Sequence, residues 1–118
     1  MYNLYVEFTA PIDDYCEALS FSIGMRSTPA AGGVNRKAQA NDASFSATSS
    51  SLSNKLLAHF MKDTKFAKVW IEFYRTSDDS LYLYYELLDV RIMSIRVNQG
   101  VDHVGLNYGT MTYKYFQK

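Results

Sequence analysis

The sequence predicts a mainly β protein: a compact two-sheet barrel or sandwich of seven or eight antiparallel strands, with one flanking α-helix at about residues 51–62. The longest strand-like run covers residues 81–116 and folds back twice, at turns that contain Gly100 and Gly109. Shorter alternating runs precede it, as is typical of an all-β chain. Residues 51–62 leave this period and show the spacing of an amphipathic helix.

Two strands are expected before residue 26. Residues 2–8 alternate, and a turn marked by Pro11 follows at residues 9–14. Residues 17–25 also alternate and end near Gly24. One face of the first strand carries Tyr2, Leu4, Val6 and Phe8, and the second strand is expected to turn Leu19, Phe21 and Ile23 inward.

Residues 26–41 lack any hydrophobic period and are rich in small residues. We expect a loop of about sixteen residues here, which exceeds the usual connection in a compact domain. It is either an ordinary surface loop or a loop that becomes ordered against another copy of the chain. Alternation resumes at residues 42–49.

The helix is expected to begin after a serine at residues 49–51, whose hydroxyl can accept a free N–H group of the first turn. Leu52, Leu56 and Phe60 share one stripe, and Lys62 suits the C-terminal end of the helix dipole. The next strand is expected at residues 65–75, followed by a polar hairpin loop.

The remaining strands come from the long run that opens at Leu81. Asp89 lies in the middle of this run, where we expect a bulge or a bend that changes sheets. Turns at residues 98–100 and at Gly109 then separate two further strands.

Composition limits the possible functions. The 118 residues are expected to form one domain, and no window of 18 apolar residues predicts membrane insertion. Twelve basic and twelve acidic residues cancel, which argues against a nucleic-acid partner. Residues 1–8 lack the pattern of a secretory signal peptide, and the single cysteine, Cys16, excludes an internal disulfide.

The residues that could perform catalysis are few. Cys16 with His59 or His103 could form a thiol–imidazole pair, but no local signature unites them. We interpret Cys16 as a small strand-edge residue, His59 as a helix-flank residue and His103 as a solvent-facing turn residue. The spacing of histidine, cysteine and aspartate predicts no metal site, and no phosphate-binding glycine motif predicts a cofactor. The sequence therefore does not predict an enzyme.

Tyrosine is the unusual component, with ten residues. Tyr82, Tyr84, Tyr113 and Tyr115 lie on predicted strands whose alternate residues are also apolar, so both faces need a cover. The cover is either the helix and second sheet of the same subunit, or a second chain. Tyrosine suits the second case because it has a large apolar body and a polar tip.

Several segments of the chain match a known family pattern. The strongest is Tyr-Tyr-Glu-Leu-Leu-Asp-Val at residues 84–90. The other matching segments are residues 17–25, 31–33, 44–48, 53–57, 66–73 and 104–113. In this order and spacing they resemble the Hcp family, the tube-forming proteins of bacterial type VI secretion systems.

The resemblance implies a structural subunit of the type VI secretion inner tube, which assembles into hexameric rings that stack into a hollow tube for effector delivery. The expected partners are other copies of the chain, a contractile sheath, a spike protein and effector proteins. The expected location is the bacterial cytoplasm, followed by export through the apparatus without a signal peptide. Phage tail tube proteins are similar in fold and use.

The loop at residues 26–41, by its resemblance to the extended loop of the family, is expected to reach an adjacent subunit or the next ring. The alternative function is a monomeric β-sandwich that binds a ligand through its tyrosine-rich face. The predicted subunit-interface residues are Arg26, Pro29, Gly32, Gly33, Asn35, Arg36, Lys37, Tyr82, Tyr84, Tyr113 and Tyr115.

Overall fold

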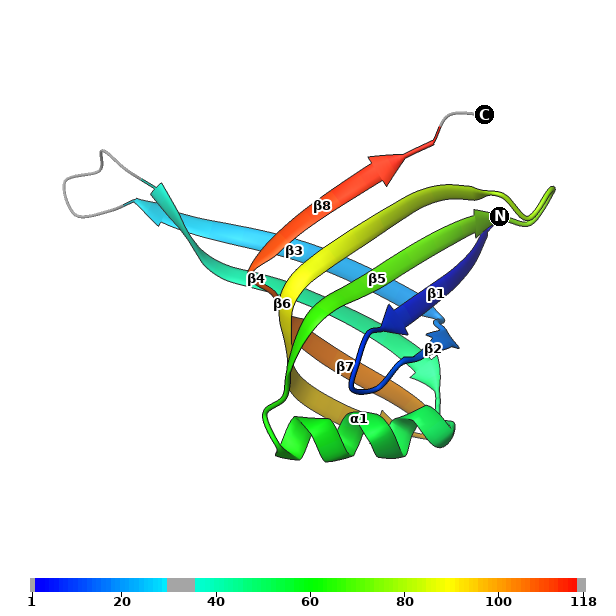
Figure 1. Ribbon diagram of the computed structural model, residues 1–118, viewed down its shortest axis with the longest axis horizontal. Coiled ribbons are helices and arrows are strands. Elements are labelled where there is room, and N and C mark those ends of the chain that lie inside the picture. The colour runs from blue at the N-terminus through cyan, green and yellow to red at the C-terminus, as the bar shows by residue number, and fades with distance from the viewer. Residues whose placement is uncertain (1, 30–35, 117–118) are drawn as a thin grey trace.

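The fold is mainly β, as the sequence predicts (Figure 1). The computed structural model describes the backbone of residues 2–29 and 36–116 and the side chains of residues 3–24 and 42–116. These residues contain eight strands and one helix: β1 (Tyr2–Phe8), β2 (Asp14–Glu17), β3 (Ser20–Pro29), β4 (Arg36–Thr48), α1 (Ser51–Met61), β5 (Lys65–Arg75), β6 (Leu81–Asn98), β7 (Val101–Asn107) and β8 (Thr110–Tyr115).

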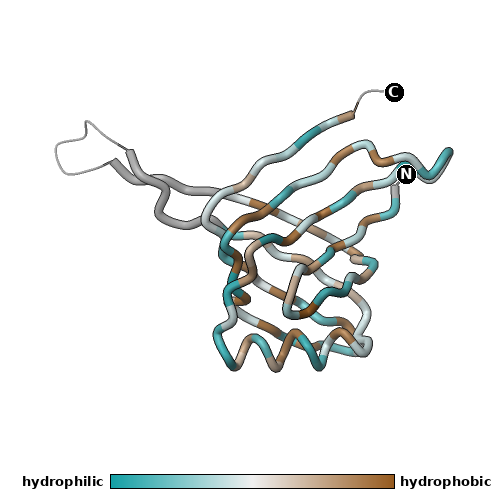
Figure 2. Tube along the Cα trace, viewed as in Figure 1, coloured by the Kyte–Doolittle hydropathy of each residue, from teal (hydrophilic) through white to brown (hydrophobic). Residues whose placement is uncertain are grey.

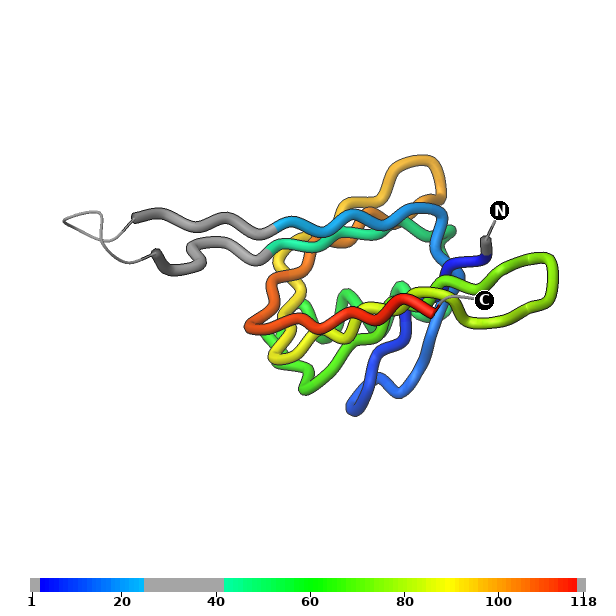
Figure 3. Tube along the Cα trace, turned by 90° about the horizontal axis from the view of Figure 1, so that it is seen from above, coloured from blue at the N-terminus to red at the C-terminus, as the bar shows by residue number. Residues whose placement is uncertain are grey.

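The strands pair antiparallel in the order β2-β1-β5-β6-β7-β4-β3, and β8 lies beside β6. The two ends of this order are joined by Ala18 and Leu19. The Ala18 N–H donates to the Leu4 carbonyl at 2.8 Å, and the Leu19 N–H donates to the Ser46 carbonyl at 2.7 Å. One continuous segment thus pairs first with β1 and then with β4, which curls the sheet into a barrel with two opposed layers (Figure 3).

This crossing corrects the prediction of one strand at residues 17–25. Alternation continues across Ala18 and Leu19, but the chain changes partner there, so β2 ends at Glu17 and β3 starts at Ser20. Leu19 was expected inside and is 61% exposed, because it lies in the crossing rather than in a strand.

The predicted bend in the long strand is confirmed at Asp89, which has a φ of 56°. Before the bend, β6 pairs with β8 from Leu83 to Leu88. After it, β6 pairs with β7 from Arg91 to Asn98. The bend therefore lets one strand pair with β8 before Asp89 and with β7 after it.

The core lies between the layers and above α1 (Figure 2). The helix buries Leu52 and Leu56 and packs against β6 and β2. Residues at alternate positions of the strands complete the core, with Val6, Ile71, Leu87 and Val104 among the fully buried side chains.

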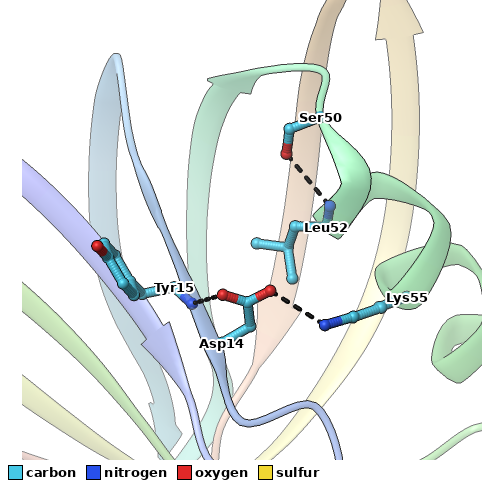
Figure 4. Close-up of polar contacts among 5 residues, drawn as sticks. All are labelled: Asp14, Tyr15, Ser50, Leu52 and Lys55. Atoms are coloured by element: carbon cyan, nitrogen blue, oxygen red, sulfur yellow. Dashed lines mark hydrogen bonds and ion pairs between the residues drawn. The ribbon is translucent and has the colours of Figure 1, made fainter.

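The start of α1 is fixed by side chains that satisfy its free N–H groups. Ser50 is the N-cap, as the sequence predicts for this region, and its hydroxyl accepts from the Leu52 N–H at 3.2 Å (Figure 4). The buried carboxylate of Asp102 on β7 accepts from the hydroxyls of Ser49 and Ser53.

A surface ion pair links β2 to the same helix. The Lys55 Nζ lies 3.1 Å from Asp14 Oδ2, while Asp14 Oδ1 accepts from the Tyr15 N–H (Figure 4). The pKa of Asp14 is lowered, mainly by the hydrogen bond from the Tyr15 N–H and to a smaller extent by the one from Lys55. Because the pair is solvent-exposed, it orients β2 against α1 and adds little stability.

Candidate assembly surfaces

The first candidate surface is the extension of β3 and β4 beyond the barrel (Figure 1). The prediction of a loop at residues 26–41 is wrong for residues 26–29 and 36–41. These residues continue the β3–β4 ladder, with Arg26 opposite Ala40, Thr28 opposite Lys37 and Pro29 opposite Arg36. A ladder is built from backbone groups, so it needs no hydrophobic alternation.

We call residues 25–29 and 36–41 the arm. Of the predicted interface residues, the arm contains Arg26, Pro29, Arg36 and Lys37. Gly32, Gly33 and Asn35 lie outside the described residues.

The second candidate surface is strand β8, which forms one rim of the barrel. It pairs with β6 along one edge. Within residues 2–29 and 36–116, no strand pairs with its other edge. A free edge presents unpaired N–H and C=O groups, so it is a template for a strand from another chain.

Tyr113 and Tyr115 on β8 are 63% and 61% exposed. Each is paired in register with a side chain that packs on the core, Tyr113 with Tyr85 and Tyr115 with Leu83. The Tyr113 and Tyr85 rings are 5.7 Å apart. The two tyrosines therefore lie on the same face of the sheet as the core residues Tyr85 and Leu83, but the subunit does not cover them.

Tyr82 and Tyr84 have different environments. Tyr82 packs on the core, and the Arg75 guanidinium lies 4.9 Å from the centre of its ring. Tyr84 is paired in register with Lys114 on the opposite face of the sheet and stacks on Phe116 at 6.1 Å. The structure therefore does not bring the predicted tyrosines into one pocket.

The structure also brings together residues that the sequence interpretation did not select. A surface pocket of about 410 Å³ lies on the outer face of β1, β2 and β5. We call it the tyrosine–glutamate pocket, and its lining residues are Tyr5, Glu7, Tyr15, Glu72, Tyr74 and Asp79. The alternation of Tyr5 with Glu7 and of Glu72 with Tyr74 was a usable signal, but only the β1–β5 register shows that the pairs are adjacent.

A polar face covers the outside of β3 and β4. The hydroxyls of Ser20 and Ser46 are 2.6 Å apart, and those of Ser22 and Ser44 are 2.9 Å apart. His103 is part of this face: it lies on β7 opposite Ser46, so its prediction as a turn residue is wrong. The serine hydroxyls are paired with each other across the two strands.

The cysteine does not have the environment of a nucleophile. The pKa of Cys16 is raised to about 11, mainly by burial and to a smaller extent by the charges of Asp102 and Asp14. The thiol is therefore protonated near neutral pH, whereas an activated cysteine has a lowered pKa. His59 is bound to the Thr64 hydroxyl at 2.9 Å, which agrees with a position on the helix flank.

The described residues contain no cluster of histidine, cysteine or carboxylate side chains that could hold a metal ion. In the same part of the chain, no helix is long and apolar enough to cross a membrane.

Known structures share this fold. Hcp1 from Salmonella typhimurium has a TM-score of 0.76 at 13% identity, covering 97% of this chain and 86% of that one. A type VI secretion system effector from Yersinia pestis has a TM-score of 0.75 at 12% identity, covering 98% and 91%. Secreted protein Hcp3 from Pseudomonas aeruginosa has a TM-score of 0.68 at 17% identity, covering 99% and 100%.

No curated protein is similar enough in sequence to match this chain. The family model described as "Type VI secretion system effector, Hcp" matches residues 9–115, which is nearly the whole sequence. The barrel, the flanking helix and the sequence match agree, and the chain belongs to the Hcp family of type VI secretion proteins.

Proposed function

We propose that this chain is a structural subunit of a type VI secretion inner tube, forming hexameric rings that stack into a hollow tube for effector delivery. The observation that carries the proposal is the free edge of β8, beside the exposed rings of Tyr113 and Tyr115. Membership of the Hcp family supports it.

The free edge offers a neighbour two kinds of interaction. A strand that pairs with β8 gains backbone hydrogen bonds, as in β-strand addition. The same neighbour covers Tyr113 and Tyr115, which adds the burial of two large side chains. A contact in which one edge meets a different surface of the next copy is head-to-tail, and it closes into a ring when the rotation allows.

The function proposed here needs no catalytic group and no cofactor. The partners are other copies of the chain, a contractile sheath, a spike protein and effectors carried in the tube, with neither nucleic acid nor membrane insertion involved. The subunit is made in the bacterial cytoplasm and leaves through the secretion apparatus.

The experiment is negative-stain microscopy of the purified full chain, together with light scattering over a range of concentrations. Six copies of a 13.5 kDa chain give a ring of about 81 kDa. Annular particles of that mass are expected. A 13.5 kDa monomer at every concentration, with no rings in the micrographs, would falsify the proposal.

The alternative, a monomeric binding module built on Tyr82, Tyr84 and Tyr113, gains no support from the structure. Tyr82 packs on the core, and Tyr84 lies on the opposite face from Tyr113. A chain that stays monomeric in light scattering would favour this alternative over the ring.

A further inference from the structure

The tyrosine–glutamate pocket has the composition of a cation-binding site. The ring of Tyr5 lies 6.0 Å from that of Tyr15 and 5.7 Å from that of Tyr74, both edge to face. The pocket thus presents aromatic surfaces together with the carboxylates of Glu7 and Glu72. Aromatic rings and carboxylates both attract guanidinium and ammonium groups.

The two carboxylates lack a positive partner within the described residues. The ion pairs there use the carboxylates of Asp14, Asp63, Asp89 and Glu86. Glu72 accepts from the Tyr74 hydroxyl at 3.2 Å. The pKa of Glu72 is raised, mainly by burial and to a smaller extent by the neighbouring charge of Glu7. A cation that entered the pocket would relieve the repulsion between the two carboxylates.

The chain has a basic segment that matches this pocket. Residues 26–41 contain Arg26, Arg36 and Lys37 and no acidic residue. The rest of the chain therefore holds nine of the twelve basic residues against all twelve acidic ones, so a segment of charge +3 balances a body of charge −3. Arg36 and Lys37 are adjacent at the start of β4, in the arm.

The arm and the pocket lie toward opposite ends of the molecule. The arm projects from one end of the longest axis, and the β5–β6 turn, which contributes Asp79 to the pocket, lies at the other end (Figure 1). The molecule is 49 Å long in this direction. The basic arm of a subunit therefore points away from the pocket of the same subunit (Figure 1).

We propose that the tyrosine–glutamate pocket of one subunit binds a basic side chain of the Arg36–Lys37 segment of the next copy. The contact is head-to-tail, with the same two surfaces used at every step, as a closed ring requires. Tyr5, Tyr15 and Tyr74 supply the aromatic surfaces, and Glu7 and Glu72 supply the charge. The inference rests on the assembly proposed above and names one of its contacts.

The test is a double-mutant cycle on assembly of the full chain, measured by sedimentation velocity and microscopy. One variant is Glu7→Gln with Glu72→Gln, which keeps the shape of the pocket and removes two of its three carboxylates. The other is Arg36→Gln with Lys37→Gln, in the arm outside the barrel. Each is expected to raise the subunit dissociation constant about tenfold, and the combined variant is expected to be no worse than either one.

A control removes one carboxylate outside the pocket by Asp13→Asn, at an exposed position. Circular dichroism and thermal melting verify that each variant folds.

The outcomes separate this inference from the proposed function. Wild-type rings whose dissociation constant is unchanged in both glutamine variants would overturn the inference and leave the tube proposal intact. Fully additive effects of the two variants would also overturn it, since the groups would then act at separate places. A wild-type chain that never assembles would overturn the tube proposal itself.

Discussion

Strands β7 and β8 lie along the same side of β6, on either side of its bend at Asp89, but their inner faces differ. On β7 the inner face is closed: Val104 and Leu106 are 1% and 2% exposed. On β8 the inner face is open, and Tyr113 and Tyr115 are mostly accessible.

The difference comes from the cover, not from the strand sequences. Tyr108, just after β7, is buried and its hydroxyl donates to the Gly24 carbonyl at 3.3 Å. Tyr113 has the same side chain five positions later, where the described part of the chain provides no such cover. The inner face of β7 is thus covered within the subunit, whereas Tyr113 and Tyr115 on the inner face of β8 are not.

The largest effect on stability is expected from Leu106→Ala on β7. Removing a fully buried leucine leaves a cavity, so the free energy of unfolding should fall by about 2–5 kcal/mol. Urea unfolding followed by circular dichroism measures it. Leu57→Ala on the exposed side of α1 is the control and should change stability by less than about 0.5 kcal/mol. Similar losses of unfolding free energy for the two variants would contradict the burial of the inner face of β7.

The next effect is expected from Asp102→Ala, also on β7. The substitution leaves the hydroxyls of Ser49 and Ser53 without their buried acceptor, so we expect a loss of about 1–3 kcal/mol. Asp102→Asn keeps one acceptor oxygen and should lose less. Equal losses in the two variants, measured by thermal melting, would show that the hydroxyl contacts are not what Asp102 contributes.

Several elements of the subunit could be predicted from the sequence. The periodic patterns located β1, β5 and both halves of β6, and the helical spacing located α1, because each of these elements buries one face in the subunit's own core. The bend at Asp89 was also predictable, since a polar residue interrupts an apolar run.

The arm and the faces of the tyrosines were not predictable in this way. The arm is held by backbone pairing, which leaves no trace in side-chain periodicity. Tyr82 and Tyr84 have the same parity in sequence, but the β5–β6 register shifts between Phe73 and Tyr74. The shift leaves Tyr82 as the extra residue of β6 and turns it toward the core, away from Tyr84.

A smaller effect is expected from Gly105→Ala on the outer face of β7. A Cβ atom at this position would lie 2.5 Å from the Ser94 Oγ of β6, so the hydroxyl must move. We expect a loss of about 1 kcal/mol. Because the contact is with one side-chain atom, adding Ser94→Ala should restore most of the stability. A loss that persists in the double variant would place the conflict in the backbone instead.

The smallest effect on stability, and the largest on assembly, is expected from Tyr113→Ser with Tyr115→Ser on β8. Both side chains are exposed, so the free energy of unfolding of the isolated subunit should change by less than about 1 kcal/mol. Ring formation, followed by light scattering and microscopy, should be lost because the neighbour no longer gains the burial of two aromatic rings. Thr112→Ser is the control on the opposite face of the same strand, opposite Glu86, and should assemble normally. Intact rings in the double variant would show that β8 is not the covered surface, whereas a subunit destabilised as strongly as Leu106→Ala would show that β8 belongs to the core and that the contrast with β7 is false.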